Sequence, residues 1–472
     1  MAFVEWLQER GGVSPVAVLG RDNRLSSPGL AGGVTRGFGE AGWRVEDLGV
    51  VPTPVLYWAR QRYGIDAGVM VTGSHNEARF NGFKLAAGPG TIYGEDIRDV
   101  GRRARRLAEK PETAHLTGVA GHAAVAAGPG TPERPGVVPA GAGSVGANPL
   151  AAYLSDLRGR IRLPEGGRRL RVAVDCGSGT ASLVAPTLFR ELGCEVLPIY
   201  CDLDGAFPGH WPDPVQPENL VELQDLVVRE RADLGVAFDG DGDRLGVVDD
   251  QGEILWGDVI MILFWREILA RRPGAKVLVE VKCSQALVDE VLRLGGEPRF
   301  CRTGHSLIKA RMREIGAPFA GEMSGHMFFA DEYYGFDDAV YAAARLLRIL
   351  AGTERPLSAL LSDRPRYFAT PETRLECGDE IKFSVVEKVR RRFVREGREV
   401  IDVDGARVIF PGGGWILVRA SNTQPALVVR CEATTGEELE RLKAVAAEAV
   451  GEAGAVGLEA MWEERERPSR RR

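Results

Sequence analysis

The sequence has 472 residues, which at about 150 residues per domain indicates roughly three or four domains rather than a single core. Hydrophobic residues make up 44% and charged residues 27%. These are ordinary values for globular proteins, and they exclude a disordered or collagen-like chain. Sixty basic and 66 acidic residues give a net charge of −6, which offers no long-range attraction to nucleic acid or to acidic membranes.

Hydropathy and cysteine usage exclude further classes of protein. No apolar run approaches the ~20 residues of a membrane span, and the N-terminus lacks a signal-peptide pattern, so we expect a soluble, cytoplasmic protein. The seven cysteines form no Cys-x-x-Cys pair and fit neither a disulfide framework nor a zinc ribbon. We expect most of them to be small buried residues.

Short apolar runs bounded by turn residues alternate with helix-like stretches, which is typical of buried parallel strands. We expect such strands over residues 15–20, 65–72, 171–175, 234–238 and 276–281, and hence three successive α/β units. The last part of the chain differs because its strand-length runs are joined by short turns and precede a helix from residue 435. Those runs cover residues 399–403, 407–410, 414–419 and 426–432, and they predict a smaller α+β domain.

Two segments carry no regular pattern. Residues 113–148 are mostly Gly, Ala, Val, Pro and Thr, which predicts an insertion or linker. Residues 463–472 alternate acidic and basic side chains, which favours a solvated end over a nucleic-acid arm.

The first loop with candidate catalytic residues follows the strand expected at residues 65–72 and reads Thr-Gly-Ser-His-Asn. Ligands of open α/β sheets bind at the carboxyl ends of the strands. Ser74 is a candidate nucleophile, because a serine phosphorylated beforehand can donate its phosphoryl group while His75 and Lys84 hold and neutralise it. Taken alone, the same letters are also typical of an ordinary turn.

The second loop places three carboxylates at alternate positions after an apolar strand: Asp239, Asp241 and Asp243. Clustered like charges require a cation, and oxygen ligands without His or Cys favour Mg²⁺. The alternative is an EF-hand-like calcium loop, which has Gly at its sixth position and Glu at its twelfth. This sequence has Arg244 and Asp250 there, so we favour magnesium.

The third loop reads Gly-Glu-Met-Ser-Gly-His and ends at His326. Glu322 and Ser324 are candidates for binding sugar hydroxyls. His326 and the upstream His305 are candidates for moving a proton, because imidazole titrates near neutral pH. Lys282 ends an expected strand, where the crevice should lie. Each histidine alone, and Lys282, is equally compatible with a structural role.

The fourth loop follows a strand of the C-terminal domain and combines guanidinium, hydroxyl and amide groups. Arginine pairs bidentately with phosphate, so this loop is a candidate phosphate site. Its candidate residues are Arg419, Ser421, Asn422, Thr423 and Arg430. Another pair, Arg21 and Arg24, follows the first strand and by itself indicates an ordinary solvated turn.

Together the four loops indicate phosphoryl transfer on a phosphorylated sugar. The sequence resembles the α-D-phosphohexomutases over nearly its whole length, most closely the bacterial phosphomannomutase/phosphoglucomutase group. Four signature loops of that family match residues 72–76, 239–244, 321–326 and 419–425. The resemblance implies an α/β protein of three similar mixed α/β domains and a smaller C-terminal α+β domain around a central cleft.

The resemblance also implies where the domains lie. We expect domain I at 1–112, the insertion or linker at 113–148, domain II at 149–252, domain III at 253–366 and domain IV at 367–472. Each domain then contributes one of the four loops.

By the same resemblance, Ser74 is carried as phosphoserine and joins Asp239, Asp241 and Asp243 in holding Mg²⁺. Ser74 gives its phosphate to a hexose monophosphate and takes the other phosphate back from the resulting 1,6-bisphosphate, which also serves as activator. The implied catalytic residues are Ser74, His75, Lys84, Arg244, His305 and His326. The implied substrate-binding residues are Lys282, Glu322, Ser324, Arg419, Ser421, Asn422, Thr423 and Arg430.

The sequence departs from the family pattern in three places. Family members normally carry a further N-terminal stretch with a Tyr-Asp-Ile-Arg-Gly-like strand, and this sequence starts beyond it. Glu77 stands where proline usually follows Ser-His-Asn and should repel a phosphoserine modestly. The third departure is the insertion at 113–148.

The sequence thus predicts an isomerase that interconverts hexose 1- and 6-phosphates of glucose, mannose or both, with small sugar phosphates rather than nucleic acid or membranes as partners. Its oligomeric state stays open. A phosphoglucosamine mutase is the near alternative, and Met323 favours the hexose-phosphate group. An inactive sugar-phosphate-binding homologue follows if the missing strand is essential, and a phosphatase would use the same serine and metal.

Overall fold

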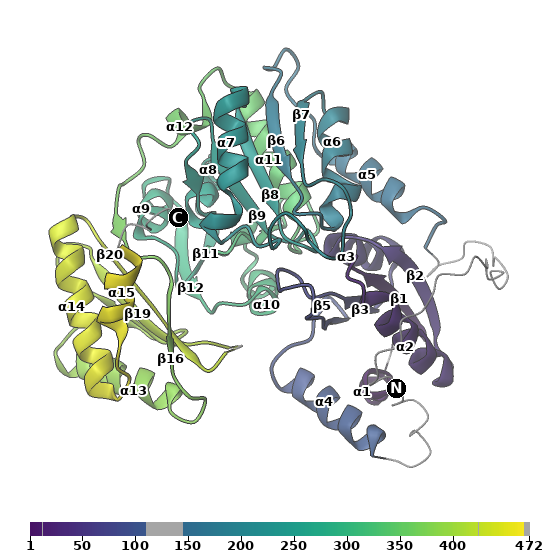
Figure 1. The fold of residues 1–472 in the computed structure, drawn as a ribbon, viewed down its shortest axis with the longest axis horizontal. Helices are drawn as coiled ribbons and strands as arrows, with labels where there is room; N and C mark the ends of the chain where they lie inside the picture. The colour runs from purple at the N-terminus through teal and green to yellow at the C-terminus, as the bar shows by residue number, and fades with distance from the viewer. Residues whose placement is uncertain (12, 110–144, 423, 467–472) are drawn as a thin grey trace. The chain divides into compact units, whose positions relative to one another are not determined.

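The computed structural model describes residues 1–11, 13–109, 145–422 and 424–466. It divides into two compact units. Unit 1 comprises residues 1–254 and 332–352, and unit 2 comprises residues 255–331 and 353–472 (Figure 1). The insertion predicted at 113–148 lies outside the described residues except for 145–148, and residues 467–472 of the predicted solvated end also lie outside them. Within the described ranges, no helix is both long and apolar enough to cross a membrane.

Unit 1 contains two five-stranded sheets with the same strand order. The first sheet runs β2-β1-β3-β4-β5 and the second runs β7-β6-β8-β9-β10, each with three parallel strands followed by an antiparallel one. The strands are β1 (Val16–Arg21), β2 (Arg44–Val50), β3 (Ala67–Val71), β4 (Phe83–Ala87), β5 (Gly90–Thr91), β6 (Arg171–Asp175), β7 (Glu195–Ile199), β8 (Leu234–Phe238), β9 (Leu245–Asp249) and β10 (Ile254–Leu255).

The central strands β3 and β8 are buried along their whole length, as continuous apolar runs predict. Strands β6 and β8 have the bounds that the sequence predicts, and the runs at 15–20 and 65–72 correspond to β1 and β3. The α/β character predicted for the first two of the three units is confirmed.

Helices of unit 1 cover both sheets. Helices α2 and α3 pack on β1 and β3, α7 packs on β6 and β8, and α11 packs on β9 (Figure 1). The helices are α1 (Ala2–Arg10), α2 (Ser27–Glu40), α3 (Thr53–Tyr63), α4 (Glu95–Ala108), α5 (Pro149–Arg160), α6 (Ala185–Glu191), α7 (Val221–Glu230) and α11 (Ala339–Ala351), with two 3₁₀ turns at Thr180–Leu183 and Pro217–Asn219.

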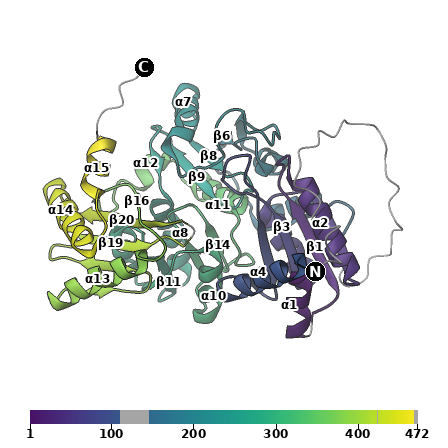
Figure 2. The same ribbon diagram turned by 60° about the horizontal axis from the view of Figure 1, so that its bottom comes forward.

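Helix α4 has no buried residue. It lies beside α1, where Arg103 forms an ion pair with Glu9 at 2.6 Å (Figure 2). The contact between α1 and α4 therefore includes ion pairs, while Val100 of α4 packs against the apolar cluster to which α1 contributes.

Unit 2 begins with the third α/β region. Strands β11 and β12 pair in parallel, β13 and β14 pair antiparallel, and β11 lies beside β13. This repeats the order of the first four strands in each sheet of unit 1. The elements are β11 (Lys276–Glu280), β12 (Glu297–Cys301), β13 (Phe319–Gly321), β14 (Met327–Phe329), α8 (Gly257–Arg271), α9 (Gln285–Arg293), α10 (His305–Ile315) and α12 (Leu357–Leu360).

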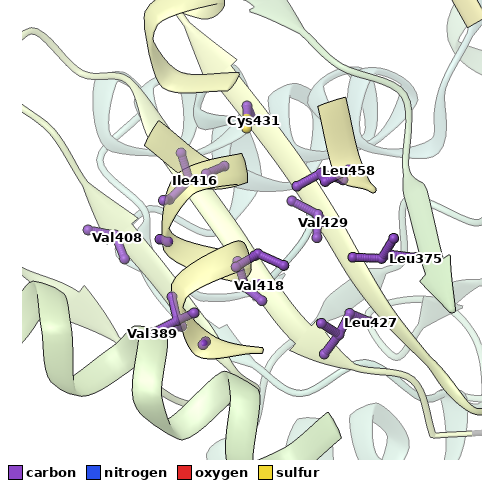
Figure 3. Packing of buried hydrophobic residues seen from close by; sticks show 14 of the residues in the cluster. Leu375, Val389, Val408, Ile416, Val418, Leu427, Val429, Cys431 and Leu458 are labelled. Carbon is purple, nitrogen blue, oxygen red and sulfur yellow. The ribbon is translucent and has the colours of Figure 1, made fainter. Parts of the chain in front are cut away.

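The C-terminal region of unit 2 is an antiparallel sheet covered by helices α13 and α14 (Figure 2). Apolar side chains from the strands and helices form its core, among them Val389, Val418 and Val429 (Figure 3). The elements are β15 (Phe368–Ala369), β16 (Thr373–Glu376), β17 (Val400–Ile401), β18 (Ala406–Ile409), β19 (Trp415–Ala420), β20 (Ala426–Ala433), α13 (Lys382–Arg395), α14 (Gly436–Ala453) and α15 (Leu458–Glu466). Helix α14 starts where predicted, with the side chain of Thr435 accepting the N–H of Glu438.

The shared strand order fixes where the chemically interesting loops lie. In each α/β region the loop connects the third strand to the fourth: residues 72–82 join β3 to β4, residues 239–244 join β8 to β9, and residues 322–326 join β13 to β14. The three loops therefore occupy equivalent positions in three versions of one motif.

Candidate active site

Ser74 lies in the loop after β3 and adopts a left-handed backbone conformation with φ of 48°. Its N–H donates to the hydroxyl of Thr72 at 2.8 Å. Its Oγ lies 2.8 Å from Oδ2 of Asp239 and 3.2 Å from Nδ1 of His75. The fold thus brings the candidate nucleophile of the first loop against the first carboxylate of the second.

The carboxylates of Asp239, Asp241 and Asp243 are fully buried, and one oxygen atom from each lies within 4.8 Å of the other two. Oδ1 of Asp239 accepts the N–H groups of Asp243 and Arg244 at 3.0 and 3.1 Å, which closes the loop on itself. Oδ2 of Asp241 accepts the hydroxyl of Thr53 at 2.5 Å. Each carboxylate is therefore held in a fixed orientation.

Lys84, in β4, brings a cation to this cluster. Its ammonium group donates to Oδ2 of Asp241 at 2.8 Å and to Oδ2 of Asp243. Burial works to lower the pKa of Lys84, but Asp241 and Asp243 outweigh burial and raise the pKa well above its ordinary value. Burial and the two neighbouring carboxylates also raise the pKa of Asp239, while Arg244 and Lys84 oppose that rise.

The cluster fits a hard divalent cation. Lys84 binds one oxygen each of Asp241 and Asp243, and Oδ1 of Asp241 is buried without a hydrogen-bond partner among the described residues. An inward-facing donor set made only of oxygen atoms is the kind that Mg²⁺ prefers. Asp239, Asp241 and Asp243 would hold such an ion, next to Oγ of Ser74.

Unit 2 brings together the residues predicted for the third loop. Glu322 is 4% exposed, and its carboxylate accepts the N–H of Gly304 at 2.7 Å and the hydroxyl of Ser324 at 3.1 Å. The rings of His305 and His326 are stacked, with centroids 5.5 Å apart. Burial works to raise the pKa of Glu322, but electrostatic interactions with His326 and Lys282 outweigh burial and lower this pKa.

Lys282, after β11, is 6% exposed and donates to Glu372 at 2.9 Å. Its ammonium group also lies 3.8 Å from Glu280. Burial lowers the pKa of Lys282, whereas Glu280 and Glu372 raise it, and the net direction is upward. The lysine is therefore held as a cation.

The residues predicted for the fourth loop lie in different surroundings. Arg419 is paired with Asp404 at 3.0 Å, and Ser421 accepts the N–H of Gln424 at 3.2 Å. Asn422 is exposed, and Thr423 lies outside the described residues. Arg430 is 7% exposed and donates to the carbonyl of Lys282, with Asp258 3.6 Å away. Arg430 thus contacts the β11 region, beneath Lys282.

Three further residues support these loops and carry no local sequence signal. Thr53 binds Asp241, and Lys382 donates to the carbonyls of Ser421 and Gln424 at 2.8 and 3.0 Å. Taken alone, the Arg21 and Arg24 pair indicates a solvated turn, but the side chain of Arg24 is fully buried beneath the Ser74 loop. Their partners lie far away in the sequence, so only the fold reveals them.

The cysteines and the three histidines outside the motifs complete the comparison with the sequence. Six cysteines are buried and Cys201 is partly buried, all as free thiols, as expected. His210, which has no motif around it, pairs with Asp175 at 3.0 Å. His115 and His122 lie outside the described residues.

Comparison with known proteins places this arrangement in a family. Four models match in order: phosphoglucomutase/phosphomannomutase alpha/beta/alpha domain I at residues 1–109, domain II at 151–252, domain III at 256–368 and the C-terminal domain at 372–449. These models cover most of the chain.

Individual relatives agree with the models. The chain is 42% identical over 431 residues to a phosphomannomutase/phosphoglucomutase of Pseudomonas aeruginosa, covering 91% of this chain and 86% of the relative. It is 39% identical to a phosphoglucomutase of Neisseria gonorrhoeae, covering 92% and 87%. The crystal structure of a phosphoglucomutase/phosphomannomutase family protein from Burkholderia thailandensis matches with a TM-score of 0.82 at 40% identity, covering 96% and 93%. The serine loop, the carboxylate cluster and these matches together show that the chain is an isomerase of the phosphoglucomutase/phosphomannomutase family.

Proposed function

We propose that this protein is a Mg²⁺-dependent mutase that interconverts the 1- and 6-phosphates of glucose and mannose through a phosphoserine at Ser74. The observation that carries the proposal is the 2.8 Å approach of Ser74 Oγ to Asp239 within a buried cluster of three carboxylates. A phosphate on this serine would stand beside the cation site, where the Lys84 ammonium group binds Asp241 and Asp243. When bound, Mg²⁺ would supply positive charge that neutralises the phosphoryl oxygens during transfer.

In the proposed reaction a sugar hydroxyl oxygen attacks the phosphorus of phosphoserine, and the bond between phosphorus and Ser74 Oγ breaks. The sugar hydroxyl proton passes to a base, for which His305 and His326 are the candidates, and the released Ser74 oxygen takes up a proton to become a hydroxyl. The product is a hexose 1,6-bisphosphate. It reverses its orientation and returns its other phosphate to Ser74. His75, Lys84 and Arg244 are proposed to neutralise and hold the transferring group.

The residues of unit 2 are proposed to bind the sugar phosphate. Glu322 and Ser324 lie 3.1 Å apart and would bind sugar hydroxyls, while Lys282 brings a buried positive charge to the same unit. Arg419, Ser421, Asn422 and Thr423 are proposed to bind the phosphate that is not transferred. Arg430 is proposed to support this set through the carbonyl of Lys282.

Phosphorus-31 NMR tests the proposal directly. The wild-type protein, Ser74→Ala and Ser155→Ala are incubated separately with mannose 1-phosphate or glucose 1-phosphate, Mg²⁺ and a trace of glucose 1,6-bisphosphate. Ser155 is an exposed serine of α5 and controls for the chemical change itself. We expect the 6-phosphates to form with the wild type and Ser155→Ala, and no conversion with Ser74→Ala.

Other outcomes separate the alternatives. Release of inorganic phosphate would indicate a phosphatase. Conversion of glucosamine phosphate in place of both hexose phosphates would indicate an aminosugar mutase. Binding of sugar phosphates without any turnover would indicate an inactive homologue, and full activity of Ser74→Ala would refute the phosphoserine.

A further inference from the structure

Arg24 lies in the turn between β1 and α2, and its side chain is fully buried. Its guanidinium group has five N–H donors, and each of them has an acceptor. Nε donates to Oδ2 of Asp22 at 3.0 Å. The other four donors reach backbone carbonyls of the Ser74 loop at 2.6 to 3.1 Å, those of Ser74, Asn76, Glu77 and Phe80.

Asp22 ties this arginine to the start of the same loop. Oδ2 of Asp22 accepts the N–H of Gly73 at 3.0 Å as well as Nε of Arg24. Its Oδ1 accepts the hydroxyl of Ser27 and the N–H of Arg24. The buried Asp22–Arg24 pair therefore holds the loop near its start, at Gly73, and at four positions beyond.

Ser74 needs such a support because its φ of 48° is uncommon for a residue other than glycine. One of the four carbonyls that Arg24 binds belongs to Ser74 itself, at 2.7 Å. Gly73 lies directly against the arginine, since a Cβ there would stand 2.6 Å from Cζ of Arg24. With the carbonyls turned towards Arg24, Oγ of Ser74 is free to face Asp239 at 2.8 Å.

We propose that Arg24 is a positioning residue for phosphoryl transfer: it fixes the loop backbone so that Ser74 Oγ is aimed at the carboxylate cluster. This inference rests on the proposed phosphoserine at Ser74. The hydrogen bonds of Arg24 run to Asp22 and to the backbone of the Ser74 loop, so we infer that it acts through the loop. A lysine at position 24 keeps the charge but has three donors on one nitrogen, and it cannot serve five acceptors spread around a planar guanidinium.

The experiment compares Arg24→Lys with Arg60→Lys. Arg60 is a second buried arginine of the same region, and it also donates to three backbone carbonyls, those of Asp66, Gly88 and Gly90. None of these belongs to the Ser74 loop, so Arg60→Lys controls for the loss of a buried arginine as such. Each protein is phosphorylated with glucose 1,6-bisphosphate, and the phosphate per chain is measured by intact mass.

The decisive readout is the single-turnover rate of transfer from phosphoserine to glucose 1-phosphate, divided by the phosphoserine present. We expect Arg24→Lys to lose about 10- to 100-fold in this rate, with the half-saturating sugar-phosphate concentration unchanged. We expect Arg60→Lys to keep the wild-type rate per phosphoserine, although both variants melt at lower temperature. A merely structural role would lower the melting temperature and the folded fraction without changing the rate per phosphoserine.

Two results would overturn the inference: a wild-type rate in Arg24→Lys, or an equal loss in Arg60→Lys. If Arg24→Lys does not fold, Asp22→Asn replaces it, because it weakens the same support while keeping the size of the side chain. For Asp22→Asn, a loss in the transfer rate per phosphoserine that is smaller than the 10- to 100-fold expected for Arg24→Lys supports the inference, and an unchanged rate overturns it. A wild type that takes up no phosphate on Ser74 refutes the proposed function instead, and this is measured first.

Discussion

Asp338 is a buried carboxylic acid outside the candidate active site. It caps α11 by accepting the N–H of Tyr341 at 2.9 Å, and it accepts the hydroxyls of Tyr153 and Tyr333 at 2.9 and 2.7 Å. Burial raises the pKa of Asp338 to about 6, although these hydrogen bonds work in the opposite direction. One residue thus joins α5, α11 and the segment before α11.

This raised pKa predicts the pH dependence of stability. The folded-state pKa of about 6 lies above the ordinary value of 3.8, so folding favours the protonated acid. That contribution is fully present below about pH 4 and is lost as the pH rises through about 6. It amounts to about 2 to 3 kcal/mol.

Asp338→Asn removes this titration and keeps the size of the side chain. The difference in free energy of unfolding between the variant and the wild type should therefore shift in favour of the variant by that amount from about pH 4 to pH 7. Urea unfolding followed by tryptophan fluorescence measures it. Taking the difference cancels the titration of all other groups, and a difference that stays constant over this range contradicts the prediction.

The residues that the sequence reveals and those that it hides differ in where their partners lie. Asp239, Asp241 and Asp243 are visible in the sequence because the cluster is formed within five consecutive residues. Arg24 is hidden because four of its acceptors are backbone carbonyls 50 to 56 positions away. A carbonyl group carries no residue-type signature, so no pattern of letters could place Arg24 beneath Ser74.

At the scale of elements, strands with uniform burial are the easiest to predict. Strands β6 and β8 are apolar runs inside sheets and match their predicted bounds. The run at 399–403 shrinks to β17, which pairs with β18 over Val400–Ile401. Val403 instead packs against Val281 and Trp415, so its apolar side chain serves a different contact. Local sequence does not distinguish these two uses of valine.

The approach of the serine loop to the carboxylate loop leaves no room for a side chain at Gly240. A Cβ there would stand 2.5 Å from the carbonyl oxygen of Ser74. Gly240→Ala should therefore push the two loops apart, lowering kcat by about 100-fold and stability by about 1 to 3 kcal/mol.

Gly101→Ala is the matched control for this prediction. Gly101 lies in α4 and has open space around the position of a Cβ. The same substitution should leave kcat unchanged and raise stability by about 0.5 to 1 kcal/mol. Steady-state kinetics and thermal melting measure both variants, and wild-type kcat in Gly240→Ala contradicts the close contact.

At the scale of the whole molecule, the two compact units do not coincide with the residue ranges that the family's domain models match. The model of domain III matches residues 256–368, yet residues 332–352 of that range belong to unit 1. Helix α11 has 11 of its 13 residues buried and packs on β9 and α6. Its apolar sequence predicts burial but does not say against which partner. The domain boundaries that we expect from the sequence stay a prediction.

Unit 1 should therefore fail to fold when the chain is cut after residue 254, close to the end of the domain II match at residue 252. A fragment of residues 1–254 lacks α11 and exposes the apolar surface that this helix covers. We expect this fragment to aggregate or to bind a hydrophobic dye strongly. The same fragment joined through a Gly/Ser linker to residues 332–352 should melt cooperatively. Equal melting of the two fragments contradicts the assignment of α11 to unit 1.

The late position of α11 in the chain also sets an order of events during synthesis. The ribosome synthesises the serine loop and the carboxylate loop early, but it must synthesise residues 255–331 before α11 emerges. Domains fold as units once their chain is available. Most of the unit that holds Ser74 is therefore translated first, yet this unit can complete its core only after residues 255–331 of the other unit have been synthesised.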